Sequence, residues 1–282
     1  MIELINQMKY NLQIKNYSPK TIKTYIRYVQ EFSAYFEKSP TELGDEDIRA
    51  FLHYLATEKQ VSASYIKNAY SALKFLYQKT LYRDWNTITL PRSKVPKKLP
   101  VILSPSEVQN LLNQAPNLKY KAILTTTYGA GLRVSEVVNL KIKDIDSANM
   151  LIKVRQAKGI KDRYTLLSKI NLKILREYWK TYRPQEWLFP GRYPDKPISV
   201  RSVQRTFKSA REKAGIKKEA TVHTLRHCFA THLLESGIDI YHIQQLMGHS
   251  SPKTTSIYIH LTRRHILNVR SPLDLIGYVY ND

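Results

Sequence analysis

Residues 221–237 read TVHTLRHCFATHLLESG, and residues 247–260 read MGHSSPKTTSIYIH. The two stretches bring together histidines, an arginine, a tyrosine and the only cysteine of the chain. Three kinds of structure could use such a set: a metal site, a nucleophilic active site, or a helical core that contains imidazoles. Each makes a different demand on the spacing of these residues.

A metal site fits the spacing poorly. His223 and His227 are four residues apart, as two ligands on one helical face would be. However, the segment offers no second cysteine and no carboxylate in a suitable position. We therefore expect no metal and no cofactor.

A helical core accounts for part of the segment. Apolar residues recur at helical spacing and predict one buried face over 224–236: Leu225, Phe229, Ala230, Leu233 and Leu234. Cys228 is expected to be a buried small residue rather than a reactive thiol. His227 and His232 are expected to make structural hydrogen bonds, and His227 could also help to position a site.

An anion site accounts for the remaining polar residues. His223 and Arg226 lie within one turn of an expected helix start, where unpaired N–H groups favour negative charge. Upstream, GAGLRVSE at 129–136 places Arg133 beside a glycine-bearing helix start, so the two arginines could grip one phosphate. Tyr258 follows His249 by nine residues, and a short reversal would bring both to the same pocket.

The composition favours a polyanion as the partner. The 282 residues carry a formal net charge of +22, and the pI is about 9.9. Such an excess attracts phosphate, which supplies most sequence-independent affinity for nucleic acids. A membrane surface fits less well, since no basic amphipathic anchor and no run of about 20 apolar residues is present. The single cysteine and the lack of an apolar signal core predict a cytoplasmic protein.

The rest of the chain divides into three parts. Residues 1–90 read as helices, the first clear one opening at Ser18-Pro19 and others following Gly44 and Ser62. Residues 91–103, rich in proline and lysine, predict a basic interdomain linker. A second domain, 104–282, begins with the capping box SPSE. In it we expect a β-hairpin at 151–167 around Lys158 and helices near 119–128, 169–182, 200–214, 224–236, 239–247 and 253–267.

The ordered motifs GLRVSE, AKGIKDR, HTLRHCFATHLLESG and LMGHSSPKTTSIYIH resemble those of the tyrosine recombinases, the phage-integrase family that includes Xer proteins and transposon integrases. The resemblance covers about 104–265, and more loosely the N-terminal helices as a SAM-like core-binding domain. It implies a mainly α fold with a small β-sheet. In that fold a helical core-binding domain and a mixed α+β catalytic domain form a C-shaped clamp.

The resemblance also implies a role for each motif residue. Tyr258 resembles the nucleophile that becomes joined to a 3′ phosphate, and Arg133 and Arg226 resemble the pair that neutralises the developing charge. Lys158 resembles the hairpin lysine that protonates the departing 5′ oxygen; it is preferred to Lys161 and Arg163 of the same hairpin because it immediately precedes the turn glycine, as in the family. The remaining site residues are the acid/base residue His223, the phosphate-contacting His249 and the supporting carboxylate Glu136.

The implied activity is site-specific cleavage and rejoining of double-stranded DNA in integration, excision or resolution, without ATP. The implied assembly is a monomer or weak oligomer that becomes a homotetramer on two DNA sites, through a C-terminal tail that includes Leu273 and Ile276. A second recombinase or an accessory protein is left open as a further partner. Because no arm-binding domain precedes Ile22, a short recombinase of Xer or mobile-element type is expected.

Two other functions remain open on the sequence. A type IB topoisomerase uses similar chemistry to relax supercoils as a monomer. A DNA-binding protein with a degenerate catalytic domain would share the fold without the reaction, although every catalytic position of the family pattern is filled here.

Overall fold

The structure is a computed structural model that describes residues 1–85, 99–155, 162–249 and 251–261. The chain forms two compact units, Met1–Lys97 and Lys98–Asp282, which are described separately below. In the described residues, no helix has the length and apolar character that crossing a membrane requires.

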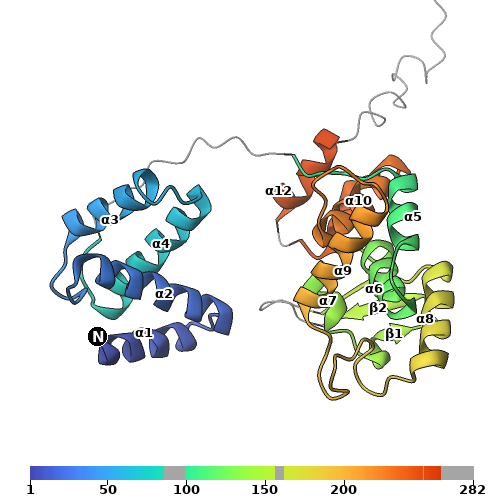
Figure 1. Ribbon diagram of the computed structural model, residues 1–282, viewed down its shortest axis with the longest axis horizontal. Coiled ribbons are helices and arrows are strands. Elements are labelled where there is room, and N and C mark those ends of the chain that lie inside the picture. Colours follow the sequence, from blue (N-terminus) through green and yellow to red (C-terminus); the bar gives the residue numbers. More distant parts are fainter. Residues whose placement is uncertain (86–98, 156–161, 250, 262–282) are drawn as a thin grey trace, which may run out of the picture. The chain divides into compact units, whose positions relative to one another are not determined.

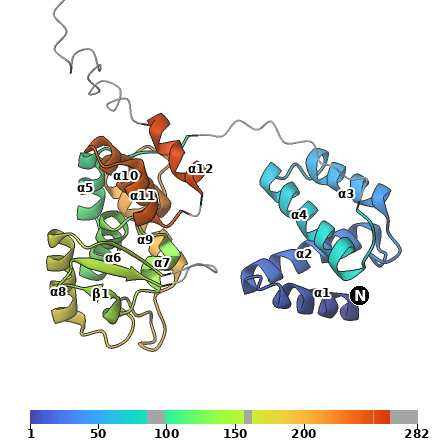
Figure 2. The same ribbon diagram turned by 180° about the vertical axis from the view of Figure 1, so that it is seen from behind.

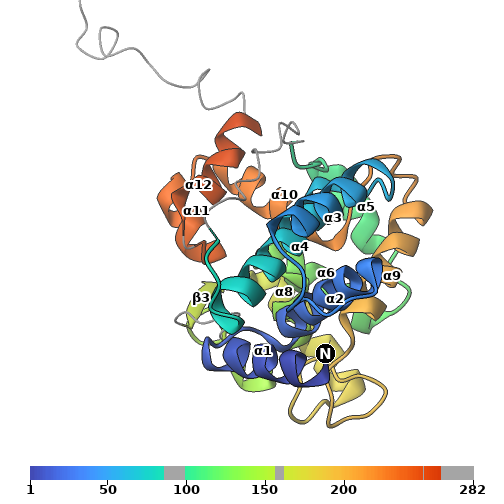
Figure 3. The same cartoon turned by 90° about the vertical axis from the view of Figure 1, so that its left-hand side faces the viewer.

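The N-terminal unit is entirely helical where it is described (Figures 1 and 3). Its elements are α1 (Ile2–Ile14), α2 (Pro19–Phe36), α3 (Asp45–Thr57), α4 (Ala63–Phe75) and a π-helical turn, η1 (Leu76–Thr80). As the sequence predicts, Ser18 caps α2 by accepting a hydrogen bond from the Thr21 amide, and Pro19 occupies the first turn. The apolar faces of these helices meet in one core that contains Met8, Phe32 and Phe51.

The second unit is mixed. Its helices are α5 (Pro105–Asn113), α6 (Leu118–Gly129), α7 (Val134–Val138), α8 (Lys169–Tyr182), α9 (Val200–Lys213), α10 (Val222–Glu235), α11 (Ile240–Met247) and α12 (Pro252–Thr255), with 3₁₀ turns η2 (Ile142–Asp144) and η3 (Ser256–Leu261). Its strands are β1 (Ile145–Asp146), β2 (Leu151–Val154) and β3 (Arg163–Leu166). The capping box predicted at the start of α5 is present: Ser104 Oγ accepts from the Glu107 amide, and Glu107 accepts from the Ser104 amide.

The three strands form one antiparallel sheet in the order β1-β2-β3. In the predicted hairpin, Ile152 pairs with Thr165 and Val154 pairs with Arg163. Residues 156–161 of the turn, Lys158 among them, lie outside the described part of the chain. Helix α8 packs on α6 and lies at the same end of the unit as the strands (Figure 2).

Helix α10 holds the motif that opens the sequence, and it packs against α6, α11 and η3. Leu225, Phe229, Ala230 and Leu234 are buried, as the helical spacing predicts, whereas Leu233 is only partly buried. Cys228 is fully buried, as expected for a small core residue. Leu103, at the end of the predicted linker, is also fully buried, and its amide donates to Cys228 Sγ at 3.2 Å.

The prediction of one regular helix over 253–267 is wrong for the residues that the structure describes, 253–261. Helix α12 ends at Thr255, and the chain continues as a 3₁₀ turn through Leu261. Tyr258 therefore sits on a tight turn rather than on a regular helix. Residues 262–267 lie outside the described ranges.

Candidate active site

A glycine-dependent turn places Arg133. Gly131 has a φ of +61°, and a Cβ built on it would lie 2.3 Å from Phe229 Cδ1. The turn therefore needs glycine both for its backbone conformation and for its contact with α10. Two residues later, Arg133 caps α7 in an extended conformation, and its side chain remains 35% exposed.

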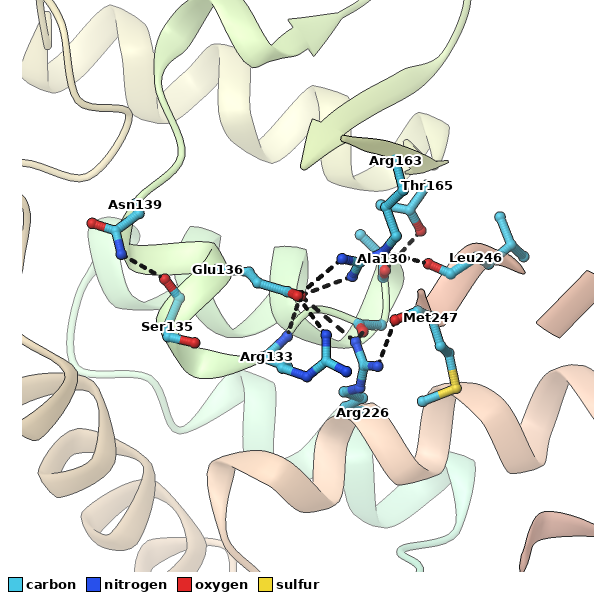
Figure 4. Close-up of polar contacts among 11 residues, drawn as sticks. Ala130, Arg133, Ser135, Glu136, Asn139, Arg163, Thr165, Arg226, Leu246 and Met247 are labelled. Atoms are coloured by element: carbon cyan, nitrogen blue, oxygen red, sulfur yellow. Dashed lines mark hydrogen bonds and ion pairs between the residues drawn. The ribbon is translucent and has the colours of Figure 1, made fainter. Parts of the chain in front are cut away.

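Glu136 gathers three guanidinium groups (Figure 4). It accepts from Arg133 Nη1 at 2.7 Å and from the Arg133 amide at 2.8 Å. Arg163 donates to both carboxylate oxygens, at 2.9 and 2.8 Å, and Arg226 Nη1 lies 3.6 Å away. Burial alone would raise the pKa of Glu136, but the hydrogen bonds and charge of Arg163, with Arg133 and Arg226, lower it to about 2. The carboxylate is therefore charged at every physiological pH.

Arg226 is the most enclosed cation of the site, with 1% of its surface exposed. Its Nη1 donates to the Gly131 carbonyl and its Nη2 to the Met247 carbonyl, each at 2.6 Å. Burial, reinforced by the charge of Arg133, lowers the pKa of Arg226 to about 9, which still leaves it charged near neutral pH. The two carbonyls and Glu136 fix this charge in place.

The sequence offered Arg163 only as a less favoured alternative to Lys158 on the hairpin, and the structure gives it contacts of its own with the site residues. Besides its bidentate contact with Glu136, its Nε donates to the Leu246 carbonyl at the end of α11, at 3.0 Å. Gly248, which ends α11 with a φ of +61°, lies against the same side chain: a Cβ there would be 2.6 Å from Arg163 Cδ. Through these contacts Arg163 holds strand β3 against the turn that precedes His249.

His249 lies directly after that turn. Its Nδ1 is hydrogen-bonded to Thr255 Oγ1 at 2.9 Å, and its ring lies nearly parallel to that of Tyr258, with centroids 6.5 Å apart. Burial first, and then the charges of Arg226 and Arg133, lower the pKa of His249 to about 3. The ring is therefore neutral at physiological pH.

Tyr258 is buried, with 1% of its surface exposed. Its ring packs in a small apolar cluster with Phe229, Ile243 and Met247. Its hydroxyl is hydrogen-bonded to His227 Nδ1 at 2.9 Å. Burial raises the pKa of Tyr258 to about 12, although the charges of Arg226 and Arg133 act to lower it. The phenol is therefore protonated at physiological pH.

His223 stands in the first turn of α10 and is exposed at the surface. Its ring meets that of His227 edge-on, with centroids 4.6 Å apart. Partial desolvation, followed by the charges of Arg226 and Arg133, lowers the pKa of His223. The first two turns of α10 thus carry three polar side chains of the site: His223, Arg226 and His227.

Two residues of the motif, His232 and Cys228, make contacts that serve the fold rather than the site. His232 Nε2 is bonded to the Leu103 carbonyl and its Nδ1 to the Tyr128 hydroxyl, so this ring ties α10 to two other segments. Cys228 is buried, and burial raises its pKa to about 11, which keeps the thiol protonated. Within the described ranges, no three His, Cys, Asp or Glu side chains are grouped as metal ligands would be.

The sequence matches two family models. The model of the phage integrase family covers residues 102–265, and that of the phage integrase N-terminal SAM-like domain covers residues 4–87. Each match coincides with one of the two compact units.

Individual relatives agree with this assignment. A putative integrase/recombinase, y4qK, of Sinorhizobium fredii is 46% identical over 98% of this chain and 90% of its own length. The tyrosine recombinase XerA of Pyrococcus horikoshii is 36% identical over 94% and 91%.

Solved structures show the same fold. A crystal structure of XerA recombinase matches with a TM-score of 0.56 and 32% identity over 99% of both chains. A structure of XerH site-specific recombinase bound to palindromic difH substrate matches with a TM-score of 0.72 and 24% identity, over 89% of this chain and 79% of that one.

These relatives are integrases and recombinases, so recombination rather than topoisomerase-like relaxation is the activity that they share with this chain. With its two matched domains, this chain belongs to the phage integrase family: it is a tyrosine recombinase, an enzyme that cleaves and rejoins DNA.

Proposed function

We propose that this recombinase cleaves DNA at specific sites through attack of Tyr258 on a backbone phosphate, leaving a 3′-phosphotyrosine and a free 5′ hydroxyl. One observation carries the assignment. Segments far apart in the sequence bring Arg133, Glu136 and Arg226 together, and a histidine on the same helix as Arg226 holds the Tyr258 hydroxyl.

The two arginines contribute in different ways. Phosphoryl transfer builds negative charge on the non-bridging oxygens, and charges fixed in advance stabilise it. Arg133 is partly exposed and is oriented by Glu136, so it can donate directly to an incoming phosphate. Arg226 is buried and already donates to two carbonyls, so its main contribution is a fixed positive charge below the phosphate.

The leaving 5′ oxygen needs a proton because an alkoxide is far more basic than water at neutral pH. We assign this donation to Lys158, which belongs to the turn outside the described residues, with His223 as an acid/base group at the edge of the site. His249 is neutral and adjacent to Tyr258, so it suits a hydrogen bond to the phosphate. The phosphotyrosine ester conserves the bond energy, so rejoining needs no ATP.

Tyr258 must be uncovered before it reacts, since its side chain is almost fully buried. Binding of DNA is the event that we expect to uncover it. In the free protein the nucleophile is therefore covered.

Double-stranded DNA is the partner that fits the charge. The N-terminal unit exposes Lys20, Lys23, Arg27 and Lys67 on α2 and α4, as a core-binding domain would. We propose that this domain and the catalytic domain, joined through 91–103, close around the duplex as a clamp. The tail, including Leu273 and Ile276, is assigned to contacts between four subunits on two sites; it lies outside the described residues. The reaction takes place in the cytoplasm.

The test is capture of the covalent adduct on a randomised DNA library, followed by sequencing of the attached ends. Wild type should yield adducts enriched in one sequence, whereas Tyr258→Phe should bind DNA and yield none. Tyr241→Phe is the matched control, because this tyrosine of α11 is 61% exposed and should be dispensable. A wild-type protein that forms no adduct with any member of the library would refute the proposal and favour a DNA-binding protein without catalytic activity.

A further inference from the structure

The hydrogen bond between His227 and Tyr258 gives the nucleophile a direct partner. His227 follows Arg226 on α10, and its Nδ1 lies 2.9 Å from the Tyr258 hydroxyl oxygen. In the described part of the chain this is the one hydrogen bond of that hydroxyl. A buried hydroxyl proton requires an acceptor, so the phenol donates and the imidazole nitrogen accepts.

A second pair on the same helix shows the same arrangement. His232 Nδ1 lies 2.9 Å from the Tyr128 hydroxyl, and its Nε2 lies 3.0 Å from the Leu103 carbonyl. Because a carbonyl can only accept, Nε2 of His232 carries the hydrogen and Nδ1 accepts from Tyr128. Helix α10 thus carries two imidazoles whose Nδ1 atoms each lie 2.9 Å from a phenol hydroxyl, and only the first pair includes the proposed nucleophile.

We propose that His227 is a further catalytic residue, which holds the Tyr258 hydroxyl and accepts its proton as that hydroxyl attacks the phosphate. This inference rests on the function proposed above. In the step, the O–H bond of Tyr258 breaks and its proton moves to His227 Nδ1. The phenolic oxygen bonds to phosphorus, and the bond from phosphorus to the 5′ oxygen breaks. That oxygen leaves with the electron pair and takes a proton from the donor on the opposite side. Rejoining runs the same transfers in reverse.

The surroundings of His227 explain why the proton transfer from Tyr258 takes place only when DNA is bound. Burial, then His223 and Arg226, lower the pKa of His227 to about 4, while that of Tyr258 stands near 12. The proton therefore stays on the phenol in the free protein. Of the other groups, His249 interacts with His227, and the Glu136 carboxylate nearby is paired with Arg226, Arg133 and Arg163. A DNA phosphate adds negative charge there, which raises the proton affinity of the imidazole.

The test compares His227→Asn with His232→Asn. An asparagine oxygen can take the place of Nδ1 as a hydrogen-bond acceptor, but it cannot be protonated. Single-turnover cleavage is measured on a duplex that carries the site recovered by adduct capture. We expect His227→Asn to bind this duplex normally and to cleave it roughly 10² to 10⁴ times more slowly, the usual contribution of a general base. His232→Asn should cleave bound DNA at close to the wild-type rate.

A substrate with sulfur in place of the 5′ bridging oxygen separates the two proton transfers, because a thiolate leaves without protonation. Lys158→Ala should regain its rate on this substrate, and His227→Asn should not. Rescue of His227→Asn by sulfur, or cleavage of the ordinary duplex at close to the wild-type rate, would overturn the inference. In either case an adduct on Tyr258 in the wild type would leave the proposed function standing, whereas absence of that adduct would remove both.

Discussion

Replacing Glu136 with glutamine removes the buried negative charge that three guanidinium groups share, and it should destabilise the catalytic unit by about 3 kcal/mol. The pKa of Glu136 falls from 4.5 to about 2 on folding, and each pKa unit corresponds to about 1.4 kcal/mol. Loss of one partner of a buried ion pair costs about 3–5 kcal/mol in general, which is consistent. Solvent does not screen the interaction of Glu136 with the arginines, since the Glu136 side chain is fully buried.

The sign of the pH dependence follows from the lowered pKa. The stabilisation from Glu136 is complete above about pH 5, where the carboxylate is ionised in both folded and unfolded chains. It is lost as the pH falls toward the folded value of about 2. The difference in stability between wild type and Glu136→Gln should therefore be largest near neutral pH and shrink in acid.

The assay is urea unfolding followed by tryptophan fluorescence, in which Trp179 and Trp187 report on the catalytic unit. With a slope of about 2 kcal/mol per molar urea, the midpoint should fall by about 1.5 M. Glu107→Gln is the control, because that carboxylate also caps a helix and pairs with Lys218 but lies at the surface. It should cost about 1 kcal/mol or less. Equal shifts for the two variants would refute the reasoning.

Three further predictions concern the site and DNA. Gly248→Ala should reduce cleavage far more than Gly237→Ala. A Cβ at position 248 would clash with Arg163, whereas a Cβ at position 237 meets nothing within 4 Å, so only backbone strain results there. Equal single-turnover cleavage rates for the two variants would contradict this. Arg133→Lys should lower the cleavage rate more than the DNA affinity, because lysine cannot bond Glu136 and a phosphate with one planar group; a gel-shift titration showing equal losses would argue against the role. The affinity for DNA should fall on the order of 10³-fold between 50 and 200 mM salt, since a chain of charge +22 makes many phosphate contacts; binding that is insensitive to salt would exclude this mode.

Local signals in the sequence predicted much of the fold. Ser18 and Ser104 cap helices where the sequence places them, since a cap depends on residues three positions apart. The β-hairpin likewise follows from alternation over a short span. Helix α1 and the two-residue strand β1 were not singled out, because their patterns are weak or too short to read.

The site was only partly predictable. The order of motifs predicted that Arg133, Arg226, His249 and Tyr258 would come together. In the structure Arg133 and Arg226 both lie at Glu136, and the His249 ring lies beside that of Tyr258. The contact of Arg163 with Glu136 could not be read from the sequence, because it spans 27 residues and depends on how β3 packs against α7. The contact between Arg163 of β3 and Gly248 at the end of α11 likewise leaves no periodic pattern in the sequence.

The environment of Tyr258 was also beyond sequence reasoning. Its burial follows from the 3₁₀ turn that η3 adopts and from the contacts of that turn with α10. The same packing brings its hydroxyl to His227, a residue for which the sequence favoured a structural role.

Peptide mapping of the covalent DNA adduct tests most directly whether these side chains form one cleavage site. After nuclease and protease digestion, mass spectrometry identifies which of the 20 tyrosines carries a nucleotide. A 3′-linked nucleotide on Tyr258 alone is the predicted result. A nucleotide on any other residue, with Tyr258 unmodified, would contradict the site described here.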